Sequence, residues 1–299
     1  MKVDLAILGT GTVAKDAALW GLQCGLTVQV ISRTPESASR CETALRQRLA
    51  SLNASLDPTG LSVVSRERTA LDATWVLETI PEDPALKREA WAWLLAHAPE
   101  GACLLSATSS LARRAFLPQV PRAEQVITFH PFVPMHRMKV VELALDAGPP
   151  AALQALARTL ADRLGLHRVE VQDQAGLAAS RLGLAQGLEA IRLLEAGQAD
   201  AEALDTLMMK GYGHPVGPLE LTDRVGLDVR LAIATALHAQ DGNPVFAPPP
   251  LLVKMVEAGR LGRKAGSGFY LWAQEGPLHG NASSHTRRGR ALRDPLAGL

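Results

Sequence analysis

The N-terminal stretch of the chain constrains its fold more than any other part. An apolar run at residues 3–8 ends in Gly9 and Gly11, an alanine-rich segment with helical periodicity follows at 14–21, and residues 27–31 form a second apolar run. A strand, a glycine turn, a helix and a second strand in this order are typical of a dinucleotide-binding βαβ unit. The alternative is an ordinary glycine-rich turn that binds no ligand.

The glycine turn predicts where a dinucleotide binds. Gly9 permits the tight turn, Gly11 lets the backbone approach a pyrophosphate, and Ala14 stands at the third small position, where helix packs on strand. The phosphates are expected at the helix N-terminus, where unpaired N–H groups and the helix dipole favour anions. The candidate cofactor-binding residues of this turn are Gly9, Thr10, Gly11, Thr12 and Val13.

The end of the second strand predicts which dinucleotide is preferred. An NAD site places Asp or Glu there to accept a hydrogen bond from the ribose 2′-hydroxyl, whereas a nearby Arg suits a 2′-phosphate. Here the strand ends in Ser32 and Arg33, without a carboxylate. A hydroxyl beside a guanidinium favours NADP over NAD, because the guanidinium can bind a phosphate bidentately. If Arg33 is only a solvated loop residue, this preference is lost.

Strands and helices alternate through the first half of the chain. Further strands are predicted at 61–64, 74–78, 102–106, 126–130, 139–143 and 169–171, with helices at 37–51, 84–98 and 153–164. This alternation predicts an α/β fold, a Rossmann-type doubly wound sheet with ligands at the C-terminal ends of its strands.

The second half is helical, with helices predicted at 177–197, 201–210, 218–238 and 250–258. We therefore expect a dinucleotide-binding domain at 1–174 and an all-helical domain for substrate and dimer contacts at 175–273. Residues 274–299 lack apolar periodicity and are expected to be disordered.

Composition excludes several classes of function. A net charge of +1 gives no support to a nucleic-acid or membrane-surface partner. No apolar run is long enough to span a bilayer, and the N-terminus lacks the pattern of a signal peptide. The three cysteines have no metal-type spacing. The sequence thus predicts a cytoplasmic enzyme without a metal site.

Polar residues at three predicted strand ends are candidates for catalysis. Ser109 follows the strand at 102–106, His130 ends the next strand, and Glu142 lies on the one after it. The chain has room to double back between His130 and Glu142, so antiparallel neighbours would bring imidazole and carboxylate together as a general base. On spacing alone, His130 is equally well a strand-end hydrogen bonder and Glu142 a solvated charge.

The chain resembles the 3-hydroxyacyl-CoA dehydrogenases over residues 7–270, through several separate motifs in the right order. They are Gly9-x-Gly11, Glu78-Thr79-Ile80-Pro81-Glu82-Asp83 with Leu86-Lys87, Thr108-Ser109-Ser110-Leu111, His130 with Met138-Lys139-Val140-Val141-Glu142, His214-Pro215-Val216-Gly217-Pro218-Leu219-Glu220, and Gly266-x-Gly268-Phe269-Tyr270.

The resemblance implies an enzyme that transfers a hydride between NAD(P) and the 3-hydroxyl of a short-chain acyl-CoA. It implies a catalytic pair of His130 and Glu142, with Ser109 and Ser180 contacting the substrate, and a homodimer formed through the helical domain. It also adds cofactor contacts at Ile80, Pro81, Glu82, Lys87 and Ala107.

Departures from the family's pattern put the acyl-CoA in doubt more than the hydride chemistry. The family usually has Asn where Ala107, Val133 and Ser180 stand, and the segment at 33–74 is shorter than the family's, where a helical pair helps to hold CoA. Two alternatives therefore stay open. One is a dehydrogenase of a non-CoA hydroxy acid, similar to carnitine and gulonate dehydrogenases, and the other is a crystallin-like binding protein without turnover.

Overall fold

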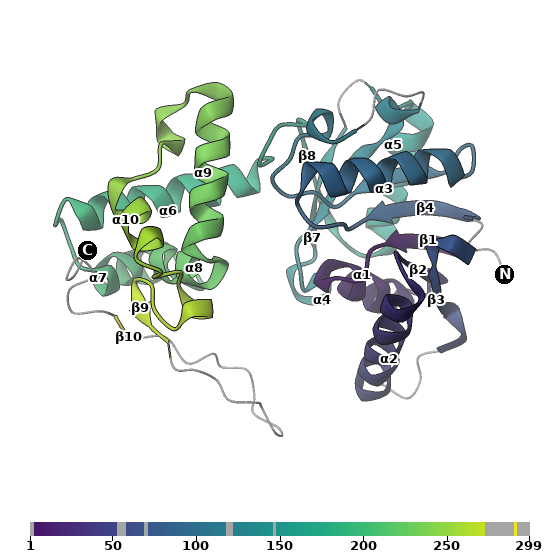
Figure 1. Ribbon diagram of the computed structural model, residues 1–299, viewed down its shortest axis with the longest axis horizontal. Coiled ribbons are helices and arrows are strands. Elements are labelled where there is room, and N and C mark those ends of the chain that lie inside the picture. The colour runs from purple at the N-terminus through teal and green to yellow at the C-terminus, as the bar shows by residue number, and fades with distance from the viewer. Residues whose placement is uncertain are drawn as a thin grey trace. The chain divides into compact units, whose positions relative to one another are not determined.

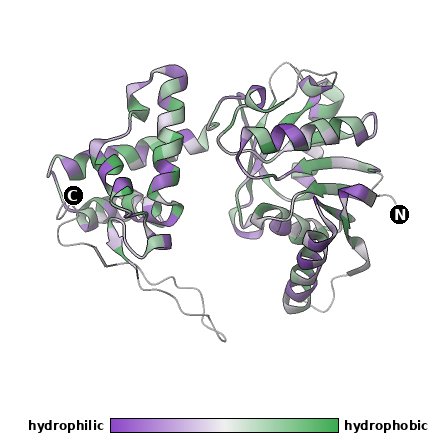
Figure 2. Ribbon diagram, in the orientation of Figure 1, coloured by the Kyte–Doolittle hydropathy of each residue, from purple (hydrophilic) through white to green (hydrophobic). Residues whose placement is uncertain are grey.

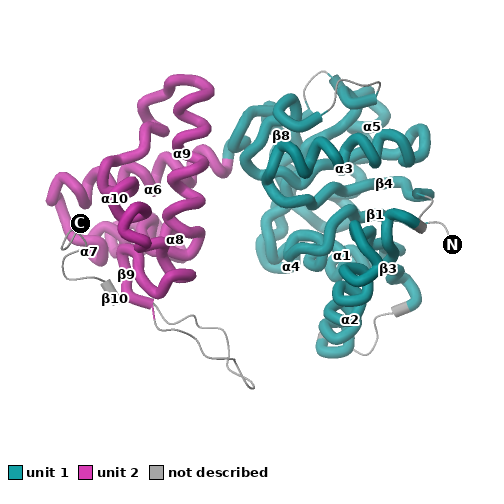
Figure 3. Tube along the Cα trace, in the orientation of Figure 1, with its two compact units in different colours: residues 1–178 teal, residues 179–299 magenta. Residues whose placement is uncertain are grey.

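The computed structural model describes residues 3–52, 58–68, 71–117, 122–145, 148–272 and 290–291. The chain divides into two compact units, Met1–Ala178 and Ala179–Leu299 (Figure 3).

The first unit is built on one mixed sheet, with eight strands among the described residues (Figure 1). Its order is β3-β2-β1-β4-β5-β6-β7-β8, and all neighbours are parallel except β6 and β7, which are antiparallel. The strands are β1 (Val3–Leu8), β2 (Val28–Ser32), β3 (Leu61–Ser65), β4 (Ala73–Glu78), β5 (Cys103–Ser106), β6 (Ile127–Pro131), β7 (Val140–Ala144) and β8 (His167–Val171). The predicted fold class, a doubly wound sheet followed by a helical domain, is confirmed.

Helices cover both faces of this sheet. Successive side chains of a strand point to opposite faces, and both sets are buried. Leu5 and Ile7 of β1 pack in the same core as α1 and α5, whereas Ala6 and Leu8 pack in the core of α3. The helices of this unit are α1 (Thr12–Gln23), α2 (Pro35–Leu52), α3 (Pro84–His97), α4 (Met135–Met138) and α5 (Ala151–Arg163). Figure 2 shows hydrophobic residues along the strands and mostly polar residues on α2.

Local sequence explains where α3 begins. The Asp83 side chain accepts hydrogen bonds from the backbone N–H groups of Ala85 and Leu86, and Pro84 occupies the first helical position. Both features are typical helix starts. Helix α4 was not predicted from the sequence, because its single turn between β6 and β7 is too short to show helical periodicity.

The second unit is helical. It contains α6 (Ala179–Glu195), α7 (Ala201–Thr206) continued by a π-helical turn at Leu207–Gly211, α8 (Pro218–Val225), α9 (Leu227–Asp241) and α10 (Pro250–Glu257). The prediction of a single helix at 218–238 was wrong, because the structure has two helices there. Gly226 has φ 105°, a left-handed value that interrupts a helix and that glycine tolerates without strain, so α8 ends there and α9 begins.

Two buried aspartates hold the second unit together. Asp205 accepts from the N–H groups of Leu219 and Glu220 and from the Tyr270 hydroxyl, and Asp223 accepts from the N–H groups of Phe269 and Tyr270 and from Trp272 Nε1. A Cβ atom at Gly268 would lie 2.1 Å from Asp223 Oδ1, so a side chain there would displace the carboxylate. This explains the glycine in the Gly268-Phe269-Tyr270 motif.

The tail predicted to be disordered, 274–299, lies outside the described residues except for β10 (Arg290–Ala291), which pairs antiparallel with β9 (Tyr270–Leu271). In the described part of the chain, every helix is too short or too polar to cross a membrane.

Candidate active site

A cavity of about 720 Å³ opens at the C-terminal ends of the central strands of the first unit. Of the cofactor-binding residues predicted from the sequence, those that line it are Gly9, Thr10, Gly11, Thr12, Val13, Ser32, Arg33, Ile80, Pro81, Glu82 and Ala107, and Ser109 lines it as well. Lys87 is the exception, because its side chain is only 1% exposed and lies behind the cavity wall. The cavity therefore joins the glycine turn, the end of β2 and the segments that follow β4 and β5.

The glycine turn fits a pyrophosphate. Gly9 has φ 129°, and a Cβ atom there would lie 2.3 Å from Thr79 Oγ1, so the turn requires glycine. Gly11 is the N-cap residue of α1 and makes no side-chain cap, and a Cβ atom there would meet no described atom within 4 Å. The first N–H groups of α1 thus remain available to an anion in the cavity.

Near the end of β2 the cavity is lined by arginines and by a serine whose hydroxyl is already hydrogen-bonded. Ser32 is buried, and its Oγ donates to the Thr34 carbonyl and accepts from the Thr34 N–H, so its hydroxyl proton belongs to the turn. Three arginines, Arg33, Arg40 and Arg66, line the cavity. Arg66 was not predicted from the sequence, although the strand-end rule that selected Arg33 after β2 applies equally to Arg66 after β3.

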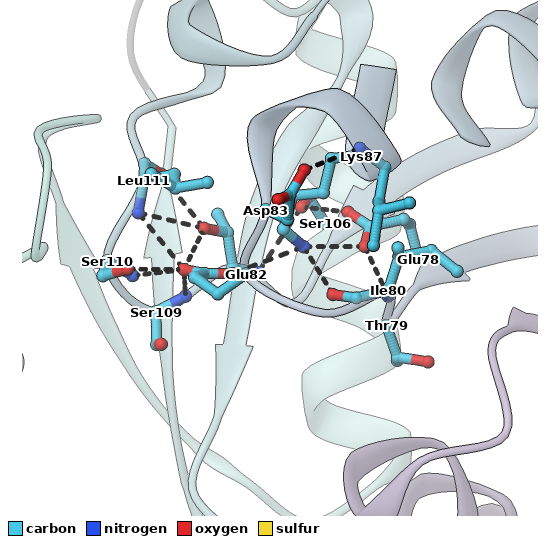
Figure 4. Close-up of polar contacts among 12 residues, drawn as sticks. Glu78, Thr79, Ile80, Glu82, Asp83, Lys87, Ser106, Ser109, Ser110 and Leu111 are labelled. Atoms are coloured by element: carbon cyan, nitrogen blue, oxygen red, sulfur yellow. Dashed lines mark hydrogen bonds and ion pairs between the residues drawn. The ribbon is translucent and has the colours of Figure 1, made fainter. Parts of the chain in front are cut away.

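A buried ionic network supports the opposite end of the cavity (Figure 4). The Glu78 carboxylate, which is fully buried, accepts from Lys87 Nζ at 2.7 Å, Ser106 Oγ at 2.7 Å, the Ile80 N–H at 2.6 Å and Trp91 Nε1 at 3.1 Å. Lys87 Nζ also donates to the Ile80 carbonyl. The Lys87 charge is therefore fully paired inside the protein and supports the 80–82 segment from behind.

Glu82 connects this network to the loop after β5 (Figure 4). Its Oε1 accepts from Thr108 Oγ1 at 2.7 Å and from the backbone N–H groups of Ser109, Ser110 and Leu111 at 2.9, 2.6 and 3.2 Å. Its Oε2 lies 3.4 Å from Lys87 Nζ. Burial alone would raise the pKa of Glu82, but the Lys87 charge and the loop donors outweigh it and lower this pKa below its usual value. The ionised carboxylate thus fixes the loop that carries Ser109.

His130 and Glu142 face one another across the antiparallel pair of β6 and β7, where the register places them opposite. His130 Nδ1 lies 2.9 Å from Glu142 Oε2, and Glu142 Oε1 accepts from the Ala178 N–H at 3.0 Å. The Glu142 side chain is 4% exposed and that of His130 is 14% exposed. With Nδ1 donating to the carboxylate, Nε2 is the acceptor nitrogen of the neutral ring.

The remaining predicted residues lie as follows. Ser106 of β5 pairs in parallel register with Thr128 of β6, so the Ser109 loop and His130 emerge from neighbouring strands at one edge of the sheet. Ser180 belongs to the second unit, on α6, and is not among the residues that the first unit assembles. Among the described residues, no group of three or more His, Cys, Asp or Glu side chains is placed to hold a metal ion.

A doubly wound sheet with a glycine turn at a helix N-terminus and a histidine–carboxylate pair on two neighbouring strands is the architecture of a nicotinamide-dependent oxidoreductase. Comparison with known proteins gives the family. Residues 4–174 match the model of the 3-hydroxyacyl-CoA dehydrogenase NAD-binding domain, and residues 176–272 match that of the 3-hydroxyacyl-CoA dehydrogenase C-terminal domain. The chain belongs to the 3-hydroxyacyl-CoA dehydrogenase family, which confirms the prediction from its motifs.

Individual relatives agree over most of their length. A probable 3-hydroxybutyryl-CoA dehydrogenase of Bacillus subtilis is 33% identical, over 89% of this chain and 96% of its own. A 3-hydroxybutyryl-CoA dehydrogenase of Mycobacterium tuberculosis is 32% identical, over 90% and 98%. The crystal structure of (S)-3-hydroxybutyryl-CoA dehydrogenase PaaH1 from Ralstonia eutropha superposes with a TM-score of 0.83 at 26% identity, over 92% of this chain and 100% of that one.

Proposed function

We propose that this protein is an NAD(P)-dependent 3-hydroxyacyl-CoA dehydrogenase that acts on a short-chain substrate such as 3-hydroxybutyryl-CoA. The observation that carries the proposal is the 2.9 Å contact of His130 Nδ1 with Glu142 Oε2, across neighbouring strands of a dinucleotide-binding sheet. The relatives match this chain over nearly their whole length, and their names support the substrate class.

The roles of the residues follow from their chemistry. The bound nicotinamide supplies or accepts the hydride. In the oxidation, Nε2 of His130 takes the proton of the 3-hydroxyl, and in the reduction it returns that proton. Glu142 fixes the ring tautomer and stabilises the imidazolium, and Ser109 orients the substrate oxygen, since positioning supplies much of the rate.

A substrate panel tests this proposal and separates it from its alternatives. Acetoacetyl-CoA and free hydroxy acids are assayed with both nicotinamide cofactors, and we expect saturation by acetoacetyl-CoA and competition by free CoA. Turnover of a free hydroxy acid instead would favour the interpretation as a non-CoA dehydrogenase. The replacement of the family's usual Asn by Ala107, Val133 and Ser180 also favours that interpretation. No turnover with any substrate would leave the crystallin-like binding role.

We propose further that NADP is preferred to NAD. Arg33 supports this preference, because it follows β2 and lines the cavity. The position before it is Ser32 and not an acidic residue, so no carboxylate stands there to repel a 2′-phosphate. Since the Ser32 hydroxyl is committed to Thr34, the guanidinium and not the hydroxyl is the expected partner of a 2′-phosphate.

The protein is also proposed to form a homodimer through its helical unit. Large hydrophobic side chains are exposed on that unit, with Leu182 at 72%, Leu207 at 62% and Tyr212 at 77%. Exposed apolar side chains of this size favour contact with a second protein surface. Light scattering on the full chain and on Leu182→Glu tests this, and a monomeric wild type would contradict it. The cytoplasmic location stays a prediction.

A further inference from the structure

Two arginines start from paired positions at one edge of the sheet. β2 and β3 are parallel neighbours whose last residues, Ser32 and Ser65, are register partners. The next residue in each segment is an arginine, Arg33 after β2 and Arg66 after β3, and both line the cofactor cavity. The sheet therefore brings two arginines to neighbouring strand ends, at the end of the cavity where the adenosine ribose of a dinucleotide lies.

A carboxylate from the facing helix occupies this cationic end. Glu89 of α3 lines the same cavity, and its Oε1 lies 2.6 Å from Arg66 Nη2. The pKa of Glu89 lies below its usual value, first because Arg66 donates a hydrogen bond to it, with the Arg33 charge adding to the effect. One carboxylate thus interacts with both strand-end arginines.

The pair is open to competition. The side chains of Arg66 and Glu89 are 25% and 55% exposed, and solvent-exposed ion pairs contribute little stability. A ribose 2′-phosphate carries up to two negative charges and three acceptor oxygens, so it offers Arg66 a stronger partner than Glu89 does.

We propose that Arg66 is a second ligand of the cofactor's 2′-phosphate beside Arg33, and that Glu89 is a resident counter-ion that competes with this phosphate and limits the selectivity for it. The ligand class is a nicotinamide dinucleotide phosphorylated on the adenosine ribose. The inference rests on the proposed NADP preference and adds to it the residues that set its size.

Binding of two adenosine nucleotides tests the inference without any turnover. Adenosine 2′,5′-bisphosphate and 5′-AMP differ only in the 2′-phosphate, so the ratio of their dissociation constants isolates that group. Titration calorimetry is performed on the full-length wild type, Arg66→Gln, Glu89→Gln and Arg88→Gln. Arg88 is the matched control, because it adjoins Glu89 on α3, does not line the cavity and donates instead to the Ala115 carbonyl.

We expect Arg66→Gln to weaken binding of the bisphosphate about tenfold, the low end for a charge-assisted hydrogen bond, and to leave the dissociation constant of 5′-AMP unchanged. Glu89→Gln should strengthen the bisphosphate by up to about fivefold, the size of an exposed ion pair. Arg88→Gln should change neither constant. Unchanged 5′-AMP binding also verifies that each variant is folded.

Two outcomes overturn the inference in distinguishable ways. If the wild type prefers the bisphosphate, and Arg33→Gln abolishes that preference while Arg66→Gln does not, only the role of Arg66 and Glu89 fails. If the wild type binds both nucleotides equally and neither arginine matters, the proposed NADP preference fails as well, whereas turnover of acetoacetyl-CoA with NADH would still uphold the dehydrogenase activity.

Discussion

At the scale of single residues, His130 is expected to be the general base. His130→Ala should leave dinucleotide binding nearly intact and lower kcat by about 10²–10⁴-fold, the usual contribution of general acid–base catalysis. Glu142→Gln should act in the same direction and less severely, because the carboxylate orients the ring and does not itself take the substrate proton. Steady-state kinetics of the single and double variants should be non-additive, since the two side chains act as one unit. Activity retained in His130→Ala would remove this residue from the mechanism.

The choice of cofactor can also be tested at single residues. The wild type should bind NADPH more tightly than NADH by at least about tenfold, because a charge-assisted pair at the exposed Arg33 alone contributes that much, the low end of its range. Ser32→Asp should reverse the order, since a carboxylate accepts from a 2′-hydroxyl and repels a 2′-phosphate. Fluorescence titration of both proteins with NADH and NADPH measures the four dissociation constants. Tighter binding of NADH by the wild type would make Arg33 an ordinary solvated loop residue.

At the scale of elements, the loop after β5 depends on a carboxylate from the segment after β4. Glu82→Gln should lower kcat/KM about tenfold, because the hydrogen bonds that Thr108, Ser109, Ser110 and Leu111 donate lose their charge assistance and Ser109 is held less firmly.

Ser109→Ala provides the comparison for Glu82→Gln. If Glu82 acts by positioning Ser109, the double variant should lose less activity than the sum of the two single losses in free energy. Strict additivity would show that Glu82 contributes through another route.

The strands, the glycine turn and the end of β2 were predictable because they follow local rules, whereas the lining residues Ile80, Pro81, Glu82 and Ala107 were implied only by the family resemblance. Hydrophobic periodicity indicated the strands, and the rule that ligands bind at strand ends selected Ser109, His130 and Arg33. Contacts that depend on tertiary packing were not predictable. In sequence, Glu89 reads as an exposed helical charge, and only the packing of α3 in one core with β2 and β3 brings it to Arg66.

The same limit applies to the second unit. Asp205 and Asp223 look like surface residues in a helical pattern, although both are fully buried. Gly226 was absorbed into one long predicted helix, because a single glycine weakens helical periodicity without abolishing it. Its left-handed backbone, which decides that two helices form, is a property of the folded chain.

At the scale of the whole molecule, Asp223 is expected to make the stability of the helical unit depend on pH. Burial raises the pKa of Asp223 from 3.8 to about 6, and the donors Trp272, Phe269 and Tyr270 offset only part of this effect. Between these two pH values the folded protein binds more protons at Asp223 than the unfolded chain does. The contribution of this group is therefore fully present below pH 4 and is lost as the pH rises through 6, by about 3 kcal/mol in total.

The prediction is tested by the difference between the wild type and Asp223→Asn in urea unfolding at pH 4.5 and pH 7.5. Asp223→Asn should destabilise the helical unit at both values, because an amide cannot accept from all three donors, and the loss should be larger at pH 4.5, where the wild type gains from protonation. Asp228→Asn is the matched control, because the pKa of Asp228 is shifted in the opposite direction. The hydrogen bond from Lys264 lowers the pKa of Asp228, so its contribution is present at neutral pH and shrinks as the pH falls. A loss in Asp223→Asn that is equal at both pH values would mean that Asp223 stays ionised in the folded protein across this range, held by its three donors.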